Sequence, residues 1–268
     1  MQNTEYLAKC GRINAFFVSL QNQTDNEMSK YKMPMAVLML MMLVAAGCHK
    51  PDEPNNGGNN GDNGNNDTIE KHEYVDLGLP SGTFWATCNV GADTPEGYGD
   101  YFAWGETSAK GIYAWKNYRY GRLYNERYEL NKYCTDSCYG LDGFVDDLVF
   151  LEPNDDVVQA QWGTDWRMPT KGEWEELLLN TVSFRTTFND VEGWIFTASN
   201  GNSLFLPATG YYWNDSFNAG LGIYWSSMIN KEFPYRAWGI HFNWDQCHIC
   251  GSSDRCRGQS VRAVRAEK

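Results

Sequence analysis

The sequence predicts an α+β fold for residues 71–268, with two short helices, small antiparallel sheets and long loops. Three observations lead to this fold class. Two segments carry helix-capping signals, many others are short and rich in β-branched or aromatic residues, and Gly and Asn turns separate them. A doubly wound sheet or a barrel would need longer and more regular elements, and the sequence contains no internal repeat.

An export signal precedes this domain. A short basic run leads into an apolar run of 15 residues at 33–47, which is followed by Cys48. A spanning helix needs about 20 apolar residues, whereas this order of basic, apolar and small residues is typical of a cleaved signal peptide. We expect residues 28–47 to be that peptide. Residues 1–27 precede a start at Met28, and we expect them to be untranslated or disordered; the alternative is an unusually long signal.

The end of the apolar run has a specific form. Ala46, Gly47 and Cys48 resemble the lipobox of bacterial lipoproteins, with Ala45 where Leu is usual. The resemblance implies that Cys48 is acylated and that its acyl chains attach the protein to the membrane. Residues 48–70 are rich in Asn, Gly and Asp, contain no aromatic residue and predict a flexible tether. We expect a lipid-anchored protein of the bacterial outer membrane, exposed at the cell surface.

Short strands are expected through most of the domain, because short β-prone segments alternate with turn residues. We place them at 73–78, 83–88, 101–104, 194–198, 203–207, 223–227, 236–244 and 260–265. A long loop is expected at 110–130, because that aromatic-rich segment shows little hydrophobic period.

The helix expected at 170–179 has the clearest local signal in the chain. Thr170 supplies a hydroxyl N-cap, and Glu173 three residues later completes a capping box. Apolar side chains then follow at helical spacing. A second helix is expected at 157–162, after the capping run 154–156. Four Trp residues in patterned segments are expected in the core: Trp85, Trp104, Trp166 and Trp174.

Four motifs occur in order along the domain. They are V-D-L-G-L-P-S-G-T-F-W-A-T-C-N-V-G-A at 75–92, Y-G-D-Y-F-A-W-G-E at 98–106, W-G-T-D-W-R-M-P-T-K-G-E-W-E-E-L at 162–177 and G-Q-S-V-R-A-V-R at 258–265. They resemble the Fibrobacter succinogenes major paralogous domain, a family found in surface lipoproteins of Bacteroidetes. The segment W-R-M-P-T-x-x-E-W also resembles the formylglycine-generating-enzyme superfamily. Both resemblances imply a C-type-lectin-like fold, and the first family carries no established activity.

Composition and motifs argue against several functions. The net charge of −12 argues against nucleic acid as a partner. The sequence has no nucleophile elbow, no zincin motif, no P-loop and no dinucleotide fingerprint. Only His72, His241 and His248 could act as a histidine base within the domain. We therefore expect a non-catalytic protein.

The cysteines allow three interpretations. An even number in an exported domain favours disulfides, with the pairing left open. The alternative is a metal site at His241, Cys247, His248 and Cys250, although a second C-x2-C pair is missing. The superfamily resemblance implies a third, a copper oxidase with two thiolates, but five residues separate Cys250 from Cys256 where that group has four. The six candidate disulfide cysteines are Cys88, Cys134, Cys138, Cys247, Cys250 and Cys256.

An oxygen-rich loop is the candidate site for a cation. Glu152, Asn154, Asp155 and Asp156 offer the carboxylate and amide oxygens that Ca²⁺ prefers. The tripeptides at 152–154 and 213–215 also match the E-P-N and W-N-D elements of C-type lectins. However, 58 residues intervene here, and tripeptides recur by chance. No other cofactor is expected, and capping of the following helix explains the loop without calcium.

Aromatic residues suggest where a ligand would bind. The chain has 11 Trp and 16 Tyr, and every Trp lies in the domain. Flat rings beside Asn and Asp suit sugar rings, although packing of a strand-poor fold explains them equally well. We expect a binding or adhesion domain for a glycan or a surface protein, with a copper oxidase or a purely structural surface component as alternatives. The candidate ligand contacts are Tyr211, Tyr212, Trp213, Asn214, Asp215, Trp225 and Trp244.

Overall fold

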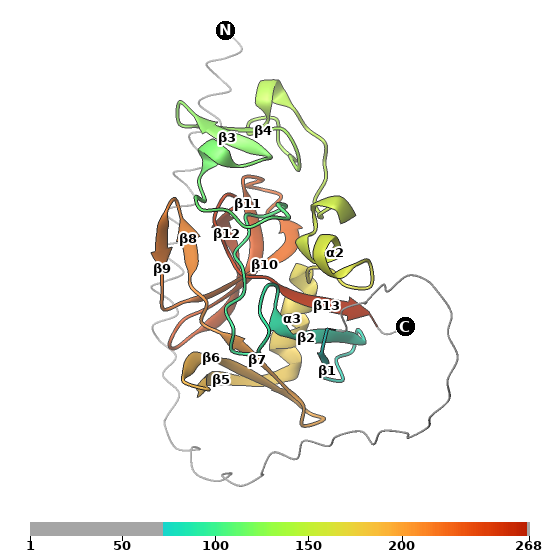
Figure 1. The fold of residues 1–268 in the computed structure, drawn as a ribbon. Helices are drawn as coiled ribbons and strands as arrows, with labels where there is room; N and C mark the ends of the chain where they lie inside the picture. Colours follow the sequence, from blue (N-terminus) through green and yellow to red (C-terminus); the bar gives the residue numbers. More distant parts are fainter. Residues whose placement is uncertain (1–71, 267–268) are drawn as a thin grey trace, which may run out of the picture. The chain divides into compact units, whose positions relative to one another are not determined.

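The computed structural model describes residues 72–266 (Figure 1). The described residues lie within one compact unit, residues 69–268. The expectations for the signal, for Cys48 and for the tether lie outside the described residues. None of the helices among residues 72–266 is long and apolar enough to cross a membrane.

Small antiparallel sheets and two short α-helices make up the domain, which is compatible with an α+β or mainly-β class. One sheet joins β1 (Tyr74–Asp76), β2 (Thr83–Asn89) and β13 (Arg262–Ala266), and a second joins β10 (Gly222–Ile229), β11 (Arg236–Phe242) and β12 (Cys247–Asp254). A third sheet joins β5 (Thr181–Phe188), β6 (Val191–Ala198) and β7 (Ser203–Pro207), and two hairpins join β3 (Gly121–Tyr124) to β4 (Arg127–Leu130) and β8 (Tyr211–Trp213) to β9 (Ser216–Asn218). In Figure 1 the β3–β4 hairpin and the β5–β6–β7 sheet lie at opposite ends of the domain.

The helix α3 (Lys171–Asn180) begins at the capping box that the sequence predicts. The Thr170 hydroxyl accepts from the Glu173 amide, and the Glu173 carboxylate accepts from the Thr170 amide. The same carboxylate forms two hydrogen bonds with the Arg167 guanidinium, at 2.7 and 2.6 Å, and accepts from the Thr83 hydroxyl at 3.1 Å. Burial raises the pKa of Glu173, but these donors hold it below its usual range. One carboxylate therefore ties α3 to β2 and to the segment before the helix.

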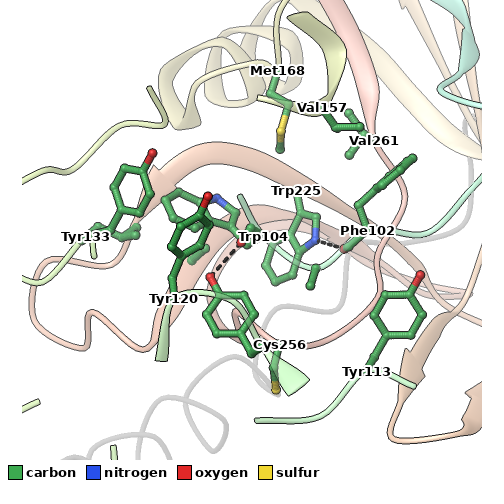
Figure 2. Packing of buried hydrophobic residues seen from close by; sticks show 14 of the residues in the cluster. Phe102, Trp104, Tyr113, Tyr120, Tyr133, Val157, Met168, Trp225, Cys256 and Val261 are labelled. Carbon is green, nitrogen blue, oxygen red and sulfur yellow. Dashed lines mark hydrogen bonds between the residues drawn. The ribbon is translucent and has the colours of Figure 1, made fainter. Parts of the chain in front are cut away.

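The core contains the four Trp side chains that the sequence places there. Trp85, Trp104 and Trp174 are fully buried and Trp166 nearly so. Two apolar clusters share the interior, and Trp85 packs on Trp174 in one of them, with ring centroids 4.6 Å apart. Figure 2 shows the other, in which aromatic rings from loops and strands meet.

A buried arginine holds the loops around this second cluster. Arg255 is fully buried, and its Nε donates to the Tyr118 hydroxyl at 2.9 Å. Its Nη1 donates to the carbonyls of Tyr133 and Pro234, at 3.1 and 2.8 Å, and its Nη2 donates to the carbonyl of Lys132 at 3.1 Å. Buried loop carbonyls need hydrogen-bond donors, and outside a sheet no neighbouring strand provides them. The forked guanidinium of Arg255 provides several N–H donors from one side chain.

Aromatic faces accommodate the charge of this arginine. The Arg255 guanidinium carbon lies 5.0 Å from the Trp104 ring centroid and 5.3 Å from that of Tyr118. Cation–π attraction is strongest where water is excluded. A buried charge among carbonyls and ring faces is therefore stabilised without a carboxylate.

The structure departs from the expected elements in several places. Residues 101–104 do not form a strand and make only a single bridge, from Phe102 to Gln259. The expected loop 110–130 contains a 3-10 turn at Trp115–Asn117 and the whole β3–β4 hairpin. Besides β3 and β4, four strands were not expected: β5, β8, β9 and β12. The remaining expected strands and both helices are present, with ends shifted by a few residues.

Replacing Arg255 tests whether the guanidinium fork holds the loops. We expect Arg255→Lys to lower the free energy of unfolding by about 2–4 kcal/mol, because an ammonium cannot reach four acceptors and leaves buried carbonyls without donors. Chemical denaturation measures the loss. Arg122→Lys is the control: Arg122 pairs with Glu129 at the surface, and we expect a change within about 0.5 kcal/mol. Equal effects of the two substitutions would contradict the role of Arg255.

Candidate functional site

The β8–β9 hairpin carries five of the seven residues that the sequence marks as ligand contacts. Tyr211 and Trp213 lie on one face of β8 and Tyr212 on the other, because side chains alternate along a strand. Asn214 and Asp215 form the two-residue turn. The φ of Asn214 is 57°, a left-handed conformation that Asn tolerates. The structure therefore brings these five side chains together.

One face of the hairpin attaches it to the domain. The Tyr212 ring lies 4.9 Å from Tyr101 and 5.7 Å from Tyr113, centroid to centroid. The backbone of Tyr212 exchanges two hydrogen bonds with Gly258. A Cβ at Gly258 would lie 2.8 Å from the Tyr113 ring, so this close approach requires glycine. Tyr212 is an anchor of the hairpin as well as a candidate contact.

The other face presents aromatic surface beside a cation. Tyr211 and Trp213 are half-buried. The Arg257 guanidinium carbon lies 4.5 Å from the Trp213 ring centroid and 5.3 Å from that of Tyr211. Arg257 is not evident as a site residue from the sequence, because it lies 44 positions after Trp213. Rings, a guanidinium and the polar turn together form what we call the hairpin surface: Tyr211, Trp213, Asn214, Asp215 and Arg257.

The expectation for Trp225 is wrong. Its side chain is fully buried, and its Nε1 donates to the Phe102 carbonyl at 2.8 Å, as Figure 2 shows. Because it packs in the core, Trp225 cannot contact a ligand. Trp244 differs: it lies between β11 and β12 and is 70% exposed, so its ring is available.

The candidate calcium loop has protein partners for its carboxylates. Asp155 accepts from the hydroxyls of Tyr120 and Tyr133, at 2.5 and 2.6 Å, and from the Lys132 ammonium at 2.6 Å. Lys132 also forms an ion pair with Glu152. Burial raises the pKa of Asp155, but these donors hold it below its usual range. The Lys132 ammonium therefore supplies the positive charge between two of the four candidate ligands.

The other two candidates serve elsewhere. Asp156 accepts from the amides of Val158 and Met168, at 2.9 and 2.8 Å, and so caps α2 (Val157–Trp162) and fixes the segment before α3. Asn154 is exposed. Among residues 72–266, no group of three or more His, Cys, Asp or Glu side chains is placed to hold a metal ion. Calcium binding by this loop stays a prediction.

The cysteines occupy different environments. No disulfide joins any of them in the described part of the chain, so disulfide formation stays a prediction. Cys256 is fully buried, and burial raises its pKa. Cys250 is half-buried on β12, and Cys247 lies on the opposite face of that strand, against the core. Thiols three apart on a strand point in opposite directions, so Cys247 and Cys250 do not face one ion.

Comparisons with known proteins return no match for this chain. No family model matches it, and neither the curated proteins nor the solved structures contain a match. Inferences about function therefore depend on the residues and their geometry.

A double-mutant cycle tests the network around Asp155. We expect Asp155→Asn and Lys132→Met each to lower the free energy of unfolding by about 2 kcal/mol, because either change leaves a buried polar group poorly paired. The double variant should lose less than the sum, with a coupling of about 1–2 kcal/mol. The control is the surface pair Lys171 and Glu175, where we expect coupling of about 0.5 kcal/mol or less. Additive losses at Asp155 and Lys132 would contradict the network.

Proposed function

We propose that this chain is a lipid-anchored protein of the bacterial outer membrane, exposed at the cell surface, with a non-catalytic binding or adhesion domain at 71–268. The observation that carries the binding function is the hairpin surface. It combines two half-buried rings, the Arg257 guanidinium and a polar turn on one β-hairpin. The lipobox resemblance at Cys48 and the tether at 48–70 support the anchor.

The proposal includes a C-type-lectin-like fold and membership of the Fibrobacter major paralogous family. Its support is the position of the quoted motifs. Residues 75–92 cover β2, residues 162–177 cover most of α3, and residues 258–265 cover most of β13. These elements pack together through Trp85 and Trp174 and through pairing of β2 with β13. The motifs thus coincide with the framework of the domain, while the hairpin surface lies outside them.

The ligand chemistry follows from the side chains of the hairpin surface. Aromatic faces stack on the apolar faces of sugar rings, and Asn214, Asp215 and Arg257 can bond to hydroxyl groups. The same residue types, Trp, Tyr and Arg, also dominate the binding energy of protein interfaces. A glycan or a surface protein therefore suits this site.

The burial and positions of Cys250 and Cys256 favour a binding function over the copper oxidase. Cys256 is fully buried in the cluster around Trp104, whereas Cys250 is half-buried on β12. A copper dithiolate needs two thiolates that face one ion, and burial disfavours the thiolate of Cys256 by raising its pKa.

Replacing Trp213 tests the hairpin surface. The full chain is screened on arrays of bacterial and host glycans and against labelled surface proteins of the same bacterium. We expect Trp213→Ala to weaken the captured interaction at least tenfold, about 1.4 kcal/mol, because a stacked ring is lost. Tyr124→Ala is the control, since Tyr124 is exposed on the other hairpin. Empty screens, or equal binding by both variants, would refute the proposed surface.

Replacing Cys48 tests the anchor separately. We expect Cys48→Ser to abolish incorporation of a labelled fatty acid and to move the protein from the membrane fraction to the soluble fraction, because the acylated sulfur is removed. Cys88→Ser is the matched control, because Cys88 lies within the domain, and it should change neither result. A Cys48→Ser protein that still carries the label would rule out this attachment.

A further inference from the structure

Strands β11 and β12 place two histidines and a cysteine on one face of their sheet. His241 and His248 are directly opposite each other, with ring centroids 6.2 Å apart. Cys250 follows His248 by two residues and therefore points to the same face. The Cys250 sulfur lies 2.8 Å from the Ser252 hydroxyl, and the Ser253 hydroxyl lies 3.1 Å from Nε2 of His241. We call His241, His248, Cys250 and Ser252 the thiol cluster.

The local backbone contributes to this arrangement. The pairing of β11 with β12 shifts register beyond Cys250, where residues 251 and 252 of β12 lie opposite the single residue 238 of β11. A bulge of this kind re-aims side chains. At this bulge the Ser252 hydroxyl lies 2.8 Å from the Cys250 sulfur.

The thiol cluster is partly exposed, and the neighbouring thiol of Cys247 is half-buried on the opposite face. His248 is exposed, and His241, Cys250 and Ser252 are half-buried. Cys247 packs against the core on the opposite face, where burial raises its pKa to about 12. Of Cys247 and Cys250, only Cys250 can therefore react with a small molecule as a thiolate.

The surroundings of Cys250 favour its thiolate. Burial raises the pKa of Cys250, but hydrogen bonds from His241 and His248, the charge of His241 and the Ser252 hydroxyl together lower it to about 5. The hydrogen bond to Cys250 in turn raises the pKa of His248. Because the folded pKa is lowered, the thiolate forms once the pH rises above about 5.

We propose that Cys250 is a nucleophilic thiolate that reacts with small-molecule disulfides, with His241 and His248 as its positioning residues. The Cys250 sulfur attacks one sulfur of the disulfide, a new S–S bond forms, and the original S–S bond breaks. Its electron pair leaves with the second thiolate, which takes a proton from water. Cys250 is oxidised to a mixed disulfide, and half of the reagent is reduced to a thiol.

Geometry favours this chemistry over a metal site at the same residues. Cys247, the other half of the C-x2-C pair, faces the core. Within residues 72–266, no set of three His, Cys, Asp or Glu side chains is positioned for a metal ion. A partly exposed thiol beside imidazoles is the environment of reactive cysteines.

The test uses the reduced full chain and a dipyridyl disulfide, whose released thiopyridone is measured at acid pH. Peptide mapping by mass spectrometry identifies the labelled cysteine. We expect Cys250 to react first, with a rate that rises through pH 5 and then levels off. At pH 6 it should react roughly tenfold faster than an ordinary exposed cysteine, because its larger thiolate fraction outweighs the lower nucleophilicity of a weakly basic thiolate.

Variants connect the rate to the cluster. His248→Gln and His241→Gln should each move the midpoint of the rate profile toward that of an ordinary thiol, with unchanged unfolding curves. Cys88→Ser is the control, because Cys88 is a half-buried thiol on β2, and the fast reaction should persist. A rate that keeps rising to pH 8, first reaction at another cysteine, or a midpoint insensitive to both histidines would overturn the proposal. Only the wild-type profile is needed if a variant fails to fold.

Discussion

Loops and the strand β2 of this domain depend on guanidinium groups that are buried among backbone carbonyls. Arg255 bonds to Tyr118 and to three carbonyls, and Arg262 bonds to Asn89 and to the carbonyls of Ala86 and Thr87. Both arginines are fully buried, and burial lowers the pKa of Arg262 to about 10. A domain with short strands leaves many carbonyls without ladder partners. Arginine supplies the missing donors, and the aromatic rings beside Arg255 accommodate its charge.

The short segment 254–258 connects this interior to the surface features. Arg255 fixes the carbonyls of Lys132 and Tyr133, whose side chains in turn hold Asp155. Two residues later, Arg257 lies on Trp213. Gly258 then pairs with β8 through Tyr212. The acidic network and the hairpin surface are thus positioned from one stretch of chain, which leads out of β12, the strand that carries Cys250.

Local signals in the sequence were sufficient for part of this structure. The capping box of α3 and the four core Trp residues involve neighbours in sequence, so they could be predicted. The strand β5 could not, because T-V-S-F-R-T-T-F is largely exposed and becomes a strand by pairing along its length with β6. Trp225 resembled a surface ring, since nothing local shows that Phe102, 123 residues away, accepts from its indole. Arg257 and the bulge at Ser252 likewise depend on distant or backbone geometry that residue types do not reveal.

Native-state hydrogen exchange tests most directly whether buried arginine holds the loops to the core. The Trp104 amide donates to the Arg255 carbonyl, and the Arg255 amide donates to the Tyr235 carbonyl, at 2.9 and 3.0 Å. We expect both amides to exchange only through global unfolding, with the same free energy as the Trp225 amide in β10. Exchange of the Trp104 and Arg255 amides through a local opening, several kcal/mol below that of Trp225, would contradict it.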